Sequence, residues 1–187
     1  MKKLLFINAC VRGESSRTLR LANAFLDTVN RNEYEIIRRD ITEGETMFLT
    51  KASFLSNGET KRDIDPSPAL EFANADKIVI AAPYWEFLFP AVLSAYMERV
   101  SIPGITFMYT ENGSKGLCKA DSLTYIYTAG DNLKYEDKLC ERYFEKLSKL
   151  YGIESFSSIS AEGLDIDPSK AQEIVDNICA KIKEKRI

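Results

Sequence analysis

Short apolar runs alternate along the chain with longer segments in which apolar residues recur every three or four positions. The runs predict five strands, at residues 3–7, 34–41, 77–83, 122–130 and 154–163. The helical spacing between them predicts five helices, at residues 19–29, 65–74, 93–100, 139–150 and 167–182. Residues 47–60 show no clean period and are consistent with either a short helix or a loop.

This alternation predicts the fold class. Strands separated by helices are joined by right-handed crossovers, run parallel and are covered on both sheet faces. We therefore expect an α/β fold, a flavodoxin-like doubly wound five-stranded parallel sheet of order 2-1-3-4-5. The units are too few for a barrel of eight strands. The length of 187 residues fits a single domain spanning residues 1–187.

Composition narrows the functional classes. A formal net charge of -3 argues against a nucleic-acid partner, and no segment approaches the run of about 20 apolar residues that a membrane-spanning helix needs. The four cysteines show no close pairing, so no metal site is predicted, and reduced thiols in the cytoplasm are expected. The chain has no histidine, which removes the usual general base and the Ser-His-Asp arrangement.

Three loops follow strands where a doubly wound sheet binds its ligands. Such ligands lie beyond the carboxyl ends of the strands, at the point where strand order reverses, here strands one and three. This position singles out the segments NACVRGESSRT, APYWEFLFP and YTAGDNL, which begin at Asn8, Ala82 and Tyr127. We expect these three loops to converge on one site.

The first loop has the composition of a phosphate site. Free amide groups at a helix N-terminus attract a phosphate, and hydroxyls and arginines add donors. The alternative is that Ser15 or Ser16 only caps the helix while the arginines are solvated. The loop fits neither a Walker A motif nor a G-x-G-x-x-G motif. The candidate residues are Arg12, Ser15, Ser16, Arg17 and Thr18.

The second and third loops could enclose a planar ring. Aromatic side chains after the third strand could shield its face, although such a cluster is also typical of a core. A glycine in the third loop would permit close backbone approach, although an ordinary strand-to-helix turn explains it equally well. The candidate residues are Tyr84, Trp85, Glu86 and Phe87 in the second loop, and Thr128, Ala129, Gly130 and Asp131 in the third.

The chain resembles the flavodoxin-like NAD(P)H:quinone oxidoreductases and the FMN-dependent NADH:azoreductases. The segments PYWEFLFP and GITFMYTENGSKGL, which begin at Pro83 and Gly104, carry the resemblance most strongly, and it extends over nearly the whole length. It implies noncovalently bound FMN, with NADH or NADPH as electron donor and a small-molecule electron acceptor. It also implies a homodimer whose subunits jointly line the substrate pocket. By position, Ser15, Ser16, Arg17 and Thr18 would hold the phosphate, and the candidate residues of the other two loops would contact the ring, whereas Arg12 is a candidate on electrostatic grounds alone.

The sequence departs from this family at several positions. Ala9 and Cys10 stand where azoreductases tend to carry serines, and Cys10 is still expected at the cofactor. Glu86 stands where asparagine is common, and Asp131 stands where a second glycine is usual. A carboxylate facing the ring would oppose the negative charge of the reduced flavin and lower its potential.

The functional hypothesis is a ping-pong enzyme in which the flavin carries the chemistry. NAD(P)H would reduce the flavin and leave, and a quinone, azo compound or similar flat acceptor would then take two electrons at the same face. No residue is predicted to be catalytic, and Tyr84 and Tyr109 are candidates for proton donors. One alternative is a flavodoxin-like electron carrier without a substrate pocket. Another, suggested by Ala9 and Cys10, is a binding or regulatory protein that has lost its flavin.

Overall fold

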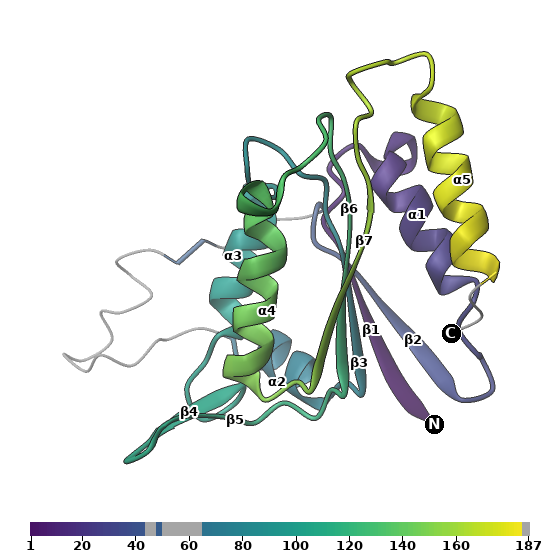
Figure 1. Cartoon of the computed structure of the whole chain (residues 1–187). Coiled ribbons are helices and arrows are strands. Elements are labelled where there is room, and N and C mark those ends of the chain that lie inside the picture. The colour runs from purple at the N-terminus through teal and green to yellow at the C-terminus, as the bar shows by residue number, and fades with distance from the viewer. Residues whose placement is uncertain (44–47, 50–64, 185–187) are drawn as a thin grey trace.

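A computed structural model describes residues 1–43, 48–49 and 65–184 of the chain. Its centre is a five-stranded parallel sheet of order β2-β1-β3-β6-β7 (Figure 1). In chain order this is 2-1-3-4-5, so the predicted topology is confirmed. The interpretation of residues 47–60 falls almost wholly outside the described residues. The strands are β1 (Lys2–Asn8), β2 (Tyr34–Asp40), β3 (Lys77–Ala81), β6 (Ser122–Thr128) and β7 (Ser155–Ala161).

Both faces of the sheet are covered, because the side chains of its central strands alternate between two hydrophobic clusters. In β1, Leu5 and Ile7 enter one cluster, whereas Leu4 and Phe6 enter the other. The second face is covered by α1 (Arg17–Leu26) and α5 (Ala171–Glu184), which contribute buried residues to the second cluster (Figure 1). The first face is covered by α2 (Ser67–Asn74), α3 (Ala91–Val100) and α4 (Leu139–Tyr151).

The predicted helices are present, with differences at their ends. α4 ends at Gly152 in the left-handed conformation that the sequence indicated. The Asp65 carboxylate accepts the Ser67 amide at the start of α2. α5 begins at Ala171 rather than at Asp167, because the Asp167 carboxylate binds the Ser169 amide and closes a separate turn first. Among the described helices, none is both long and apolar enough to cross a bilayer.

An antiparallel hairpin, β4 (Phe107–Thr110) and β5 (Gly113–Gly116), was not predicted as strands. The sequence indicated only its turn at Asn112-Gly113. Of the eight strand residues only Phe107 is buried, so no alternation of buried and exposed positions marks the strands. A Cβ at Gly116 would lie 2.0 Å from the Gly152 nitrogen, so the hairpin packs closely on the end of α4.

Candidate functional site

The three predicted loops meet at a cavity of about 330 Å³ beyond the carboxyl ends of β1, β3 and β6. The predicted convergence is therefore confirmed. A fourth segment, which follows β7, completes the wall. The lining residues are Arg12, Ser15, Ser16, Arg17 and Thr18, then Pro83, Tyr84 and Trp85, then Thr128, Ala129 and Gly130, and finally Leu164 and Asp165.

Direct contacts hold the loops together. The Thr18 and Thr128 hydroxyls lie 2.6 Å apart, which joins the first loop to the third. The Tyr84 amide donates to the Thr128 carbonyl at 2.9 Å, which joins the second loop to the third. The Arg12 guanidinium lies 6.0 Å from the centre of the Trp85 ring, within the range of a cation–π contact. The cavity is therefore a single site rather than three separate loops.

The first loop combines a cap with an electropositive wall. The Ser16 hydroxyl accepts the Leu19 amide and caps α1, while the Ser15 hydroxyl donates to the Arg12 carbonyl. Ser16 therefore caps the helix, as the alternative has it, but Ser16 and both arginines also line the cavity. Within the described part of the chain, the first-turn amides of Arg17 and Thr18 have no hydrogen-bond acceptor. These amides and two guanidinium groups give this end of the cavity the character of an anion site.

The second loop contains a strained turn. Trp85 and Leu88 exchange two backbone hydrogen bonds, of 2.7 and 2.8 Å, around the two residues between them. Both of these, Glu86 at φ 51° and Phe87 at φ 67°, lie in the left-handed region, where asparagine and glycine are favoured. Both side chains are exposed and neither lines the cavity. Of the ring contacts predicted in this loop, only Tyr84 and Trp85 line the cavity.

The third loop packs on the segment after β7, which sequence reasoning missed. The Leu164 and Asp165 amides donate to the Ala129 and Gly130 carbonyls at 3.2 and 2.9 Å. A Cβ at Gly130 would lie 2.3 Å from the Asp165 carboxylate. Because Gly130 has no side chain, the Asp165 carboxylate fits against it. The prediction was that Gly130 would permit close approach of its backbone to a ligand. This segment follows the carboxyl end of the fifth parallel strand, and that position could have indicated it from the sequence.

One acidic and one basic side chain of the lining lie next to each other, with the Asp165 carboxylate 3.9 Å from the Arg17 guanidinium. The predicted residue Asp131 does not line the cavity. It is exposed, and its carboxylate accepts the Asn132 amide at 2.7 Å. Asp131 therefore shapes the turn.

Two further predicted residues lie away from the cavity. The Cys10 side chain is buried in the second hydrophobic cluster, its thiol is 3.6 Å from the Ala81 carbonyl, and burial raises its pKa to about 11. A thiol in this position packs in the core and does not reach a ligand in the cavity. Tyr109 is exposed on the β4–β5 hairpin, at the end of the sheet opposite the cavity (Figure 1).

Tyr84 lines the cavity, but its hydroxyl is already engaged. It donates to the Asp137 carbonyl, and burial raises the pKa of the phenol above its usual value. Both features oppose release of its proton. Within one subunit, neither Tyr84 nor Tyr109 is therefore placed as a proton donor.

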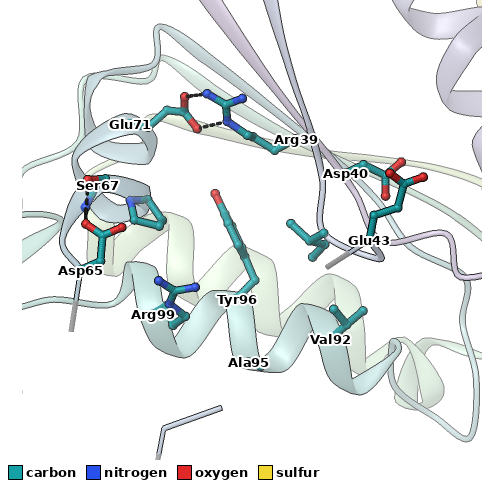
Figure 2. Close-up of a pocket in the computed structure, with 12 residues that line it drawn as sticks. Arg39, Asp40, Glu43, Asp65, Ser67, Glu71, Val92, Ala95, Tyr96 and Arg99 are labelled. Atoms are coloured by element: carbon teal, nitrogen blue, oxygen red, sulfur yellow. Dashed lines mark hydrogen bonds and ion pairs between the residues drawn. The ribbon is translucent and has the colours of Figure 1, made fainter. Parts of the chain in front are cut away.

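A second cavity, also about 330 Å³, lies between α2, α3 and the end of β2 (Figure 2). The Arg39 guanidinium forms two hydrogen bonds with the Glu71 carboxylate, of 2.7 and 2.6 Å, and Tyr96 points toward this pair. None of the three predicted loops contributes to its lining. The cavity at the strand ends is therefore the candidate site.

Comparisons with known proteins agree with this fold. A 35% identical relative, "FMN-dependent NADH:quinone oxidoreductase 2" of Clostridium acetobutylicum, matches over 98% of both chains. The FMN-dependent NADH:quinone oxidoreductase of Clostridium beijerinckii is 34% identical, also over 98% of both.

Solved structures give the same architecture. An azoreductase from Bacillus anthracis str. Sterne superimposes with a TM-score of 0.83 at 22% identity, over 100% of this chain and 99% of that one. An FMN-dependent NADH-azoreductase from Bacillus anthracis, in complex with FMN, has a TM-score of 0.82 at 23% identity, over 100% and 98%. Residues 2–185 match the family described as having a flavodoxin-like fold. With its sheet order, its cavity and its full-length relatives, this chain belongs to that flavodoxin-like family.

Proposed function

We propose that the protein is an FMN-dependent oxidoreductase that transfers two electrons from NADH or NADPH to a quinone, an azo compound or a similar flat acceptor. The observation that carries the proposal is a single cavity that joins an anion-binding helix N-terminus to an aromatic loop. The full-length relatives named as FMN-dependent NADH:quinone oxidoreductases support the same chemistry.

The residues of the cavity fit the cofactor. The free first-turn amides of α1, the Ser15 and Thr18 hydroxyls and the guanidinium groups of Arg12 and Arg17 would hold the phosphate. Tyr84 and Trp85 would lie along the ring, and residues 128–130 would face its other side. The volume of about 330 Å³ is within the range of known ligand sites.

FMN, when bound, supplies the two-electron chemistry, so the protein needs no histidine to act. The chain itself would orient the ring. The Glu86 carboxylate is outside the lining, so it would not oppose negative charge there, whereas Asp165 lies within the lining beside Arg17. Donor and acceptor would use the same open face in turn, and we expect parallel lines in initial-rate plots.

We also propose a homodimer, with the aromatic edge of the cavity at its interface. Phe87 and Leu88 beside the cavity are 62% and 47% exposed, and Tyr135 and Leu139 after the third loop are 79% and 38% exposed. Exposed apolar side chains of this size favour a partner surface. Light scattering on the purified protein tests the proposal, with Phe87→Asp expected to increase the monomer fraction.

We also infer the domain organisation and the location of the protein. We infer that residues 1–187 form a single domain, because the two hydrophobic clusters lie on opposite faces of one sheet. All four cysteines are free thiols, which favours a reducing compartment such as the cytoplasm.

The decisive experiment is a visible absorption spectrum of the purified protein with added FMN, followed anaerobically after NADH or NADPH is added. Rapid bleaching of bound FMN is expected. Bound FMN that neither nucleotide reduces would indicate an electron carrier instead. Absence of FMN binding would overturn the proposal and favour a binding or regulatory protein.

A further inference from the structure

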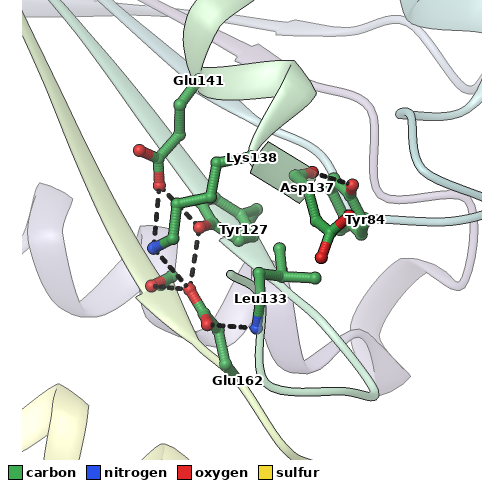
Figure 3. A network of polar contacts seen from close by, with 8 residues as sticks. Tyr84, Tyr127, Leu133, Asp137, Lys138, Glu141 and Glu162 are labelled. Atoms are coloured by element: carbon green, nitrogen blue, oxygen red, sulfur yellow. Dashed lines mark hydrogen bonds and ion pairs between the residues drawn. The ribbon is translucent and has the colours of Figure 1, made fainter. Parts of the chain in front are cut away.

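Glu162, the residue after β7, is the centre of a polar network beside the cavity (Figure 3). One carboxylate oxygen accepts the Tyr127 hydroxyl at 2.9 Å, the Lys138 ammonium at 3.0 Å and the Ser160 hydroxyl at 3.0 Å. The other oxygen accepts the Leu133 amide at 2.9 Å. A single side chain therefore connects the ends of β6 and β7 to both ends of the loop at residues 133–138.

The network is built around the negative charge of Glu162. Burial alone raises the pKa of this carboxyl, but the Leu133 amide and the Lys138 ammonium outweigh it, and the pKa lies below its usual value. The Tyr127 hydroxyl is also 2.6 Å from Glu141, yet it has only one hydrogen to donate. Lys138 lies 3.6 Å from Glu141, so it balances both carboxylates.

The loop held by Glu162 contacts the aromatic wall of the cavity. Asp137 lies within that loop, and its carbonyl accepts the Tyr84 hydroxyl. The Tyr84 ring is also 6.1 Å from the Tyr127 ring, which Glu162 holds from the other side. Tyr84 lines the cavity and immediately precedes Trp85, which lines it as well. A chain of direct contacts thus runs from Glu162 to the second loop.

We propose that Glu162 is a positioning residue: by holding residues 133–138 and Tyr127, it fixes Tyr84 and Trp85 in the wall of the cavity. Glu162 does not itself line the cavity, so it acts through these side chains. The inference deepens the proposed function and rests on it for the identity of the ligand. The positioning of Tyr84 and Trp85 by Glu162 concerns the protein without ligand, so it is tested separately from ligand binding.

The test without ligand uses Trp85, the only tryptophan of the chain, as the reporter. In Glu162→Gln and Glu162→Ala, we expect a red shift of Trp85 emission and stronger quenching by acrylamide. Glu145→Gln is the matched control, because Glu145 lies on α4 in an exposed ion pair with Lys149. Far-UV circular dichroism checks that each variant is folded. Unchanged Trp85 emission and quenching in folded Glu162→Gln would overturn the proposal.

A double-mutant cycle tests the route through Tyr84. Tyr84→Phe removes the hydroxyl that binds Asp137, and we expect it to reproduce the Trp85 shift. Adding Glu162→Gln to Tyr84→Phe should then have little further effect, because both changes interrupt the same contacts. Fully additive shifts would contradict the proposed route.

Ligand binding gives a second readout, which separates an effect at the ring from an effect at the phosphate. Glu162→Gln should weaken FMN and riboflavin by the same factor, about 3- to 10-fold for coupled neighbours, because only the ring contacts change. Weakening of FMN alone would place the effect at the phosphate and overturn the proposal. If the unmodified protein binds neither ligand, the proposed function fails, whereas the Trp85 measurements still decide the role of Glu162.

Discussion

At the scale of single residues, Arg17 distinguishes a phosphate site from a solvated surface. Its guanidinium lines the cavity and lies 3.9 Å from Asp165. Arg17→Met should weaken FMN by about tenfold, the effect of losing one hydrogen bond to a charged group. Riboflavin has no phosphate, so its affinity should hardly change. Titrations of both ligands, followed by flavin fluorescence, give the two dissociation constants.

Arg20→Met is the control for this prediction. Arg20 lies on the same helix, pairs with Asp176 and does not line the cavity. Its replacement should leave both affinities unchanged. Equal losses for FMN and riboflavin in Arg17→Met would show that Arg17 does not recognise the phosphate.

Glu86 is predicted to store strain. Its φ of 51° belongs to the left-handed region, which asparagine occupies more readily. Glu86→Asn should raise the free energy of unfolding by about 1 kcal/mol and the melting temperature by about 2–4 °C. Thermal unfolding by circular dichroism measures both. Glu111→Asn is the control, since Glu111 is an exposed turn residue without positive φ, and an equal gain there would refute the explanation by strain.

At the scale of elements, the loop at residues 133–138 should respond to acid through Glu162. The pKa of this carboxyl is lowered in the folded state, so its contribution is complete above about pH 4.3 and is lost as the pH falls through the lower folded value. Acrylamide quenching of Trp85 should therefore rise below about pH 4 in the unmodified protein. Glu162→Gln should start at the higher quenching and lack this transition. A transition of equal size in both proteins would assign it to other carboxyls.

The β4–β5 hairpin depends on a close approach of two backbones. A Cβ at Gly116 would lie 2.0 Å from the Gly152 nitrogen, and neither backbone can move away freely. Gly116→Ala should lower the free energy of unfolding by about 1–3 kcal/mol, as overpacking does. Gly130→Ala should cost less, because the exposed Asp165 side chain blocks that position and can rotate away. Urea unfolding of the two variants gives the comparison, and a larger loss at Gly130 would be inconsistent with it.

At the scale of the whole molecule, the cavity joins segments from four strands. A ligand that binds the folded form alone should stabilise it by about 2.7 kcal/mol at 100 times its dissociation constant. FMN should therefore raise the melting temperature as its concentration increases, and riboflavin should do so at higher concentrations. A melting temperature that stays constant at saturating FMN would show that the cofactor does not bridge the loops.

Sequence reasoning predicted the sheet order and the convergence of three loops, because both follow from the alternation of strands and helices. The fourth wall of the cavity was missed, since Leu164 and Asp165 carry no local motif and approach Gly130 only after β6 and β7 pair. Glu86 shows a different limit. The residue type of Glu86 does not show which way its side chain points. In the structure Glu86 lies in a turn at positive φ, and its side chain is outside the lining of the cavity.

The sequence by itself determined the periodicity of the strands and helices, and with it the edge of the sheet at which a ligand can bind. These features depend on local spacing, which the chain carries before it folds. Only the tertiary structure decided which side chains reach the cavity, that Cys10 is buried, and that Glu162 contacts residues 24 and 35 positions away. Such contacts arise where segments distant in the chain meet, so their geometry comes from packing rather than from any local pattern.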